Sequence, residues 1–211
     1  MEIFLEKLNK ITIAQIKRNI SSGICISFVI LLFTNIIYGF SNLNEIESLF
    51  PLERFIPLIG LTLIMPILEP ELDFGIYQVV RVRETSLVFI YLIRLMIALI
   101  LYSLFIIGIL FYMNKNGCTI NYNTYFYETL SIGVFLGSIG FILIGITQNK
   151  VYALLGSLSY YLLNWFVNYK KLGSIYLFRL SRGLAPLNEF KCLLAFLFII
   201  IGLISCCRRK I

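Results

Sequence analysis

The charged residues best placed to do chemistry lie in one polar stretch, EPELDFGIYQVVRVRETS, between two apolar segments. Glu69, Glu71 and Asp73 stand at its beginning, and Arg81 and Arg83 come near its end. The run between them is compatible with a short amphipathic helix that docks on a partner through ion pairs. The alternative is a plain charged connector between two spans, which composition alone favours. The two interpretations differ in whether the stretch binds another protein.

Several kinds of catalytic and metal site are excluded by residue types that the chain lacks. It has no histidine, which removes Ser-His-Asp and Cys-His catalysis and His-ligated metals. It has no Gly-Lys dipeptide, and therefore no P-loop for ATP hydrolysis. Its five cysteines form no CxxC pair, so we interpret them as small apolar fillers, with acylation as the alternative for the last two. We expect no catalytic residue, and no metal or cofactor bound by this chain.

Three glycines in one apolar segment, Gly133, Gly137 and Gly140, fall at i, i+4 and i+7 and share one face of a helix. Small residues at this spacing let two helix backbones approach closely within a membrane. The spacing predicts tight helix packing. The functional alternative is a helix that slides during a conformational cycle.

The elements that must position these residues are membrane-spanning helices. Of the 211 residues, 59% are hydrophobic and 14% are charged, and the mean hydropathy is +0.90. Backbone groups in lipid must be satisfied within their own segment, so apolar runs of roughly 20 residues are expected to be helices. We predict an all-α integral membrane protein with a single membrane domain over residues 1–211. The six predicted spans are residues 20–40, 55–68, 87–112, 127–146, 151–167 and 192–206.

Basic residues near span ends predict that both termini face the cytoplasm. Residues 1–19 include four basic residues, and on a helical wheel Glu6, Lys10 and Lys17 lie roughly opposite an apolar side. We therefore expect an interfacial helix there, with a solvated basic tail as the alternative. Residues 208–210 are all basic. An even number of spans agrees with this orientation and places residues 69–86 on the cytoplasmic side. The same topology puts residues 168–191 outside, where their basic content is unusual.

The stretch 69–94 resembles the cytoplasmic loop of ABC-2 type transporter permeases. In that family an acidic residue closes the second span, a glycine follows, and a short coupling helix leads to basic and Ser/Thr residues before the third span. Gly75, the run from Ile76 to Val82, and Thr85 with Ser86 match these positions. The resemblance assigns ATPase coupling to Glu69, Glu71, Asp73, Phe74, Gly75, Ile76, Gln78, Val79, Arg81, Arg83 and Glu84.

The resemblance implies a transmembrane permease subunit of an ABC exporter in the cytoplasmic membrane. A separate ABC ATPase subunit would bind ATP and Mg and drive transport, and a second permease copy or a homologous permease would complete the pathway. Membrane lipid is a further expected partner, and nucleic acid is not. Permeases of this small size resemble those that serve peptide or antimicrobial export and self-protection. Gln78 and Val79 stand where many members carry Glu and Leu.

A second hypothesis, from a different class, is a non-transporting membrane immunity or assembly factor that binds its target in the bilayer. A membrane enzyme working with Asp or Glu would need carboxylates inside the membrane. The sequence pattern puts nearly all carboxylates at span ends, which argues against such an enzyme.

Overall fold

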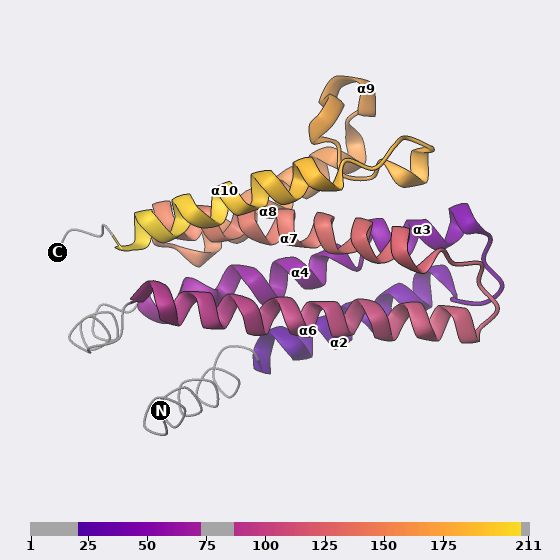
Figure 1. The fold of residues 1–211 in the computed structure, drawn as a ribbon, viewed down its shortest axis with the longest axis horizontal. Helices are drawn as coiled ribbons and strands as arrows, with labels where there is room; N and C mark the ends of the chain where they lie inside the picture. Colours follow the sequence, from indigo (N-terminus) through magenta and orange to yellow (C-terminus); the bar gives the residue numbers. More distant parts are fainter. Residues whose placement is uncertain (1–20, 73–86, 208–211) are drawn as a thin grey trace.

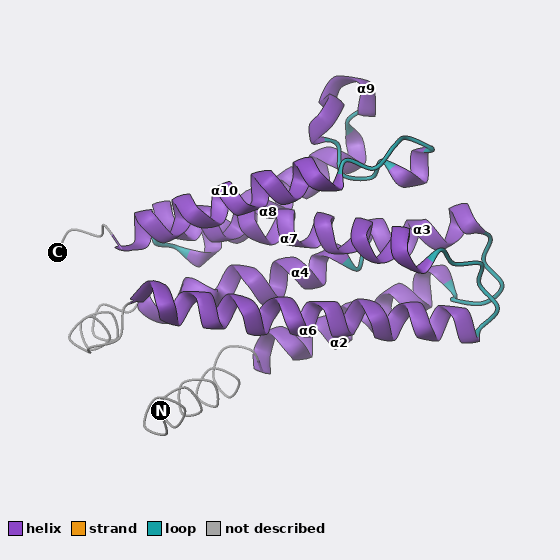
Figure 2. Ribbon diagram, viewed as in Figure 1, coloured by secondary structure: helices purple, strands orange, loops and turns teal. Residues whose placement is uncertain are grey.

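A computed structural model describes residues 21–72 and 87–207, which form a bundle of helices without a strand in those ranges (Figures 1 and 2). The helical segments run back and forth along one long axis, with α7 between its neighbours. The main helices are α2 (Ser21–Tyr38), α3 (Glu45–Arg54), α4 (Pro57–Ile64), α6 (Leu87–Lys115), α7 (Tyr122–Thr147), α8 (Lys150–Phe166) and α10 (Asn188–Cys207). The shorter pieces are η2 (Met65–Leu72), α9 (Tyr169–Leu172), η3 (Gly173–Ile175) and η4 (Leu180–Arg182).

Four helices are long and apolar enough to cross a membrane. They are Glu45–Pro70, Val88–Lys115, Tyr122–Thr147 and Asn188–Cys206. Together with the composition they make this chain a helical membrane protein. The predicted interfacial helix at 1–19 and the coupling helix at 74–84 lie outside the described residues.

The second predicted span, residues 55–68, is shorter than the helical segment Glu45–Pro70 in the structure. We expected it to begin at residue 55, after a loop, but the chain is already helical from Glu45 through α3, α4 and η2. The Asn44 side chain and the Glu47 carboxylate form a reciprocal capping box that starts α3. Pro57 then occupies the first turn of α4, where its missing N–H costs no hydrogen bond. Glu45 and Glu47, which suggested a loop, are therefore exposed residues in the first turn of a helix, whereas Glu53 of the same helix is buried.

The bundle is built around α7, which packs against α4, α8 and α10. Its fully buried neighbours include Tyr102 and Ile64, while α2 turns large apolar side chains outward. Ile36 is 78% exposed and Leu32 is 64% exposed. Apolar surface of this extent is stable in lipid rather than in water.

The two ends of the bundle are identified by contacts between distant parts of the chain. At one end, here called the Glu69 end, Lys150 Nζ lies 2.6 Å from Glu69 Oε1, and the Tyr91 hydroxyl lies 3.4 Å from Cys206 Sγ. At the opposite end, here called the Asn116 end, the Asn42 N–H donates to the Asn116 carbonyl over 3.0 Å. The loop through α9 lies toward the Asn116 end (Figure 1).

Candidate functional site

The structure describes only the first two of the predicted ATPase-coupling residues. Glu69 and Glu71 lie in η2, and the Glu69 carboxylate pairs with Lys150 at the beginning of α8. This pair is exposed, with relative accessibilities of 58% for the lysine side chain and 36% for the glutamate. The other coupling residues, which lie outside the described part of the chain, are Asp73, Phe74, Gly75, Ile76, Gln78, Val79, Arg81, Arg83 and Glu84.

Arg94 joins the two helices that flank this stretch. It lies about two turns into α6 and is 6% exposed, and its Nη1 donates to the Ile67 carbonyl of η2 over 3.0 Å. Its guanidinium also lies 5.7 Å from the centre of the Tyr91 ring. The Arg94 side chain thus links the end of η2 to α6.

Of the three glycines of α7, Gly137 and Gly140 face α4 and η2, whereas a Cβ on Gly133 would meet the Tyr102 ring of α6. A Cβ built on Gly137 would lie 2.8 Å from Ile64 Cβ, and one on Gly140 would lie 2.7 Å from Met65 Cγ. A fourth glycine, Gly60 of α4, completes the contact, since a Cβ there would meet the Gly133 carbonyl group at 2.7 Å. The backbones of α4 and α7 thus approach more closely than any side chain permits. Sequence reasoning missed Gly60 because the partner of a glycine face lies on another helix.

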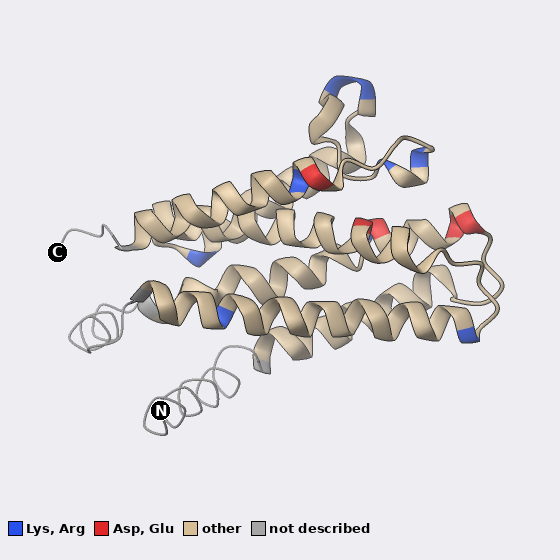
Figure 3. Cartoon of the chain, viewed as in Figure 1, with Lys and Arg blue, Asp and Glu red and all other residues tan. Residues whose placement is uncertain are grey.

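A buried ion pair joins α7 to α10. Lys191 Nζ lies 2.5 Å from Glu128 Oε1, and the two side chains are 3% and 1% exposed. The same ammonium group donates to the Leu177 carbonyl over 3.3 Å. Glu128 lies six residues into α7, about 9 Å along its axis. Figure 3 shows how few charged residues the body of the bundle carries, which makes this pair distinctive.

A second buried carboxylate, Glu53 of α3, holds the loop that leads to α10. Its two oxygens accept the backbone N–H groups of Leu180 and Ser181 over 2.8 and 3.0 Å. These amides begin the short helical turn η4, which has no side-chain cap of its own at that end. A carboxylate is well suited to this place because backbone N–H groups at a helical turn favour negative charge.

The Asn164 side chain joins the same loop to α8, and two aromatic residues of α8 contact Arg54 of α3. The Leu177 N–H donates to Asn164 Oδ1 over 2.9 Å. The Arg54 guanidinium lies 4.7 Å from the Trp165 ring centre, in reach of a cation–π interaction. The Tyr161 hydroxyl donates to the Arg54 carbonyl over 2.6 Å. The middle of this loop is therefore packed against the bundle, with residues 176–178 and Ser181 buried.

This arrangement explains part of the basic content of residues 168–191 and corrects one expectation about charge. Lys191 is a buried member of α10, and Arg179 donates to the carbonyls of Gly173 and Ala185, while Lys170, Lys171 and Arg182 are exposed. We expected nearly all carboxylates to lie at span ends, whereas Glu53 and Glu128 are buried within helices. A glutamate inside an apolar run is a sequence signal that could have located Glu128.

The buried charges of this region join helices and a loop to one another. One ammonium group neutralises one of two buried carboxylates, and Glu128 Oε2 has no hydrogen-bond partner among the described residues. Within the ranges 21–72 and 87–207, no group of three or more metal-binding side chains comes together. Comparisons with protein-family models, curated proteins and solved structures return no match for this chain.

Proposed function

We propose that this chain is the permease subunit of an ABC exporter in the cytoplasmic membrane, driven by a separate ATPase subunit. Its Glu69 end would face the cytoplasm together with both termini. The cargo class that fits the family resemblance is a peptide or antimicrobial compound, exported for secretion or self-protection.

The observation that carries the proposal is the position of the charged stretch between two helices that are tied together. The Arg94 guanidinium binds the Ile67 carbonyl, so η2 and α6 are held side by side where the stretch leaves and re-enters the bundle. A force applied between residues 72 and 87 would therefore reach both helices at once. This is what coupling to an ATPase on one side of the membrane requires.

The proposal includes six spans. Besides the four long helices, α2 and α8 have 18 and 17 residues. Their lengths are about 27 and 26 Å at 1.5 Å per residue, close to the roughly 30 Å hydrocarbon core. Local thinning of the bilayer around a slightly short helix accommodates such a small mismatch.

A single permease of this size offers one half of a pathway. We therefore expect two permease chains, identical or homologous, with two ATPase subunits that supply ATP and Mg. Isolation of the chain in mild detergent, with mass spectrometry of the proteins retained, should recover an ATPase that contains a P-loop.

The test of coupling is the double charge reversal Arg81→Glu with Arg83→Glu. These residues lie in the connection between η2 and α6, so the chain should insert and fold normally. Loss of a charge buried in an interface costs about 2–5 kcal/mol of binding, so retention of the ATPase should fall at least tenfold. ATP-dependent export should fall with it.

The matched control is Lys170→Glu with Lys171→Glu, a reversal of the same size on the exposed helix α9. It should leave ATPase retention unchanged. A chain that retains no ATPase in its wild-type form, but captures one membrane protein specifically, would instead favour the immunity or assembly role.

A further inference from the structure

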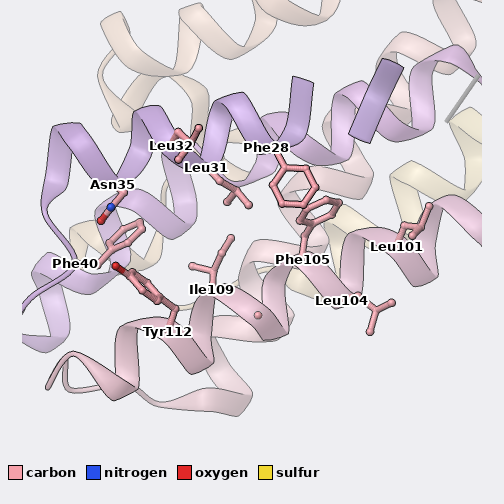
Figure 4. A pocket seen from close by; sticks show the side chains of 11 residues that line it. Phe28, Leu31, Leu32, Asn35, Phe40, Leu101, Leu104, Phe105, Ile109 and Tyr112 are labelled. Atoms are coloured by element: carbon pink, nitrogen blue, oxygen red, sulfur yellow. The ribbon is translucent and has the colours of Figure 1, made fainter. Parts of the chain in front are cut away.

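A groove between α2 and α6 opens on the membrane-facing side of the bundle (Figure 4). It has a volume of about 600 Å³, within the range of small-molecule sites. On α2 its walls come from Phe28, Leu31, Leu32 and Asn35, at helical spacing along one face. The Phe28 and Phe105 rings meet edge to face at 5.5 Å across it. The groove is thus a lengthwise gap between two helices that are bridged by aromatic contacts.

The length of the groove corresponds to one leaflet of a bilayer. On α6 it runs from Leu101 to Tyr112, which is about 16 Å along the helix axis. The hydrocarbon core of a bilayer is about 30 Å thick, so this is roughly half of it. The groove therefore matches the depth of an acyl chain belonging to the leaflet at the Asn116 end.

The groove is polar at one end only. Asn35 and Tyr112 lie near Phe40 at that end, while apolar side chains line the rest (Figure 4). Lys115, the last residue of α6, follows Gly108 by seven positions and Tyr112 by three, so it lies on the groove face of the helix. It is exposed. A cation beyond the polar end of an apolar groove complements the phosphate of a lipid headgroup.

We propose that this groove binds an anionic phospholipid, with one acyl chain along the groove and the phosphate beside Lys115. The inference needs only the membrane location of the bundle and not the transport role. It identifies a lipid of the leaflet at the Asn116 end as a bound partner.

Gly108 provides a substitution that fills the groove without disturbing the fold. It lines the groove, and a Cβ built on it would meet no atom within 4 Å. Gly108→Leu should therefore occupy the space of the acyl chain. Each methylene displaced from apolar contact costs about 0.8 kcal/mol, or about fourfold in binding, so loss of two methylenes lowers retention more than tenfold.

The experiment is native mass spectrometry of the delipidated full chain in detergent, titrated with phosphatidylglycerol or with phosphatidylcholine. The wild type should retain one phosphatidylglycerol molecule in preference to phosphatidylcholine. Gly108→Leu should lose this adduct more than tenfold. Lys115→Gln should weaken phosphatidylglycerol about fivefold, the effect of about 1 kcal/mol for one basic residue at an anionic membrane surface. It should weaken phosphatidylcholine less, because the choline group offsets the charge of the phosphate.

Two matched variants control for general effects. Ile107→Phe adds volume at the adjacent exposed position of α6, outside the groove, and Lys171→Gln removes a charge from α9. Both should bind lipid as the wild type does. Equal retention of the two lipids by the wild type, or an adduct that survives Gly108→Leu, would overturn the proposal. A wild-type dimer that Gly108→Leu converts to monomer would also overturn it, by identifying a second copy of the chain as the occupant.

Discussion

At the scale of single residues, the ion pair of Lys191 with Glu128 is a buried contact between α7 and α10. The desolvation cost of burying two charges is about as large as the attraction between them, so such a pair is weak evidence for stability. Removal of one partner is different, because it leaves an uncompensated charge in an apolar interior. The pair therefore constrains which arrangements of α7 and α10 are possible.

We predict that Lys191→Met lowers the free energy of unfolding by about 3–5 kcal/mol, since Glu128 then remains buried and unpaired. The double variant Lys191→Met with Glu128→Leu should recover most of that loss, because both charges are gone. Thermal unfolding of the purified chain in detergent measures both effects.

The pair of Lys150 with Glu69 is the natural control for this experiment. It has a similar distance but an exposed setting, so Lys150→Met should change the unfolding free energy by only about 0–1 kcal/mol. A double variant at positions 128 and 191 that is as unstable as Lys191→Met alone would show that the hydrogen bond from Lys191 to the Leu177 carbonyl matters more than the ion pair.

At the scale of elements, the crossing of α4 and α7 depends on glycine. Without a hydrophobic driving force between helices in lipid, association relies on close packing. The contact of Gly60 with Gly133 brings the two backbones together, and a similar contact joins α7 to α10, where a Cβ on Gly145 would lie 2.8 Å from the Gly202 carbonyl oxygen. Helix α7 is therefore held on two sides by glycine contacts.

We predict that Gly60→Ala destabilises the bundle by about 1–3 kcal/mol, the usual cost of overpacking a well-filled interior. Its Cβ would press on backbone atoms of α7, which cannot move as a side chain end can. The unfolding midpoint in detergent should fall accordingly.

Gly108→Ala is the matched control, because it makes the same change in a helix where the added Cβ meets nothing within 4 Å. It should leave the midpoint unchanged or raise it, since alanine is favoured over glycine in helices by about 1 kcal/mol. Equal destabilisation by the two substitutions would mean that helix propensity, rather than the α4–α7 contact, governs the response.

At the scale of the whole molecule, the arrangement of the ends bears on orientation. Lys150 lies at the Glu69 end, and Lys170 lies in the loop region toward the Asn116 end. Both residues are exposed. Cys118 is only 5% exposed, so it is a poor reporter of topology, and introduced cysteines are needed.

In a chain with its five native cysteines replaced, we predict that Lys170→Cys reacts with a membrane-impermeant thiol reagent on intact cells. Lys150→Cys should react only after lysis, because the proposed topology places it in the cytoplasm. The same two variants labelled in detergent control for reactivity. The reverse pattern of labelling on intact cells would invert the proposed orientation.

The sequence by itself determined that this is a helical membrane protein, and it located most helix ends closely. Predicted spans at 20–40, 87–112 and 151–167 correspond to α2, α6 and α8 within three residues at each end. These features are local, since hydropathy and helical spacing depend on residues that are neighbours in the chain. The glycine face of α7 was visible for the same reason.

Only the tertiary structure decided what the charged residues do. Lys191 meets Glu128 across 63 positions, and Glu53 receives the Leu180 N–H across 127 positions. No local pattern contains such pairs, and charge alone made α3 resemble a loop. Burial of a charge depends on which distant partner neutralises it, and that partner is brought into place only when the helices pack.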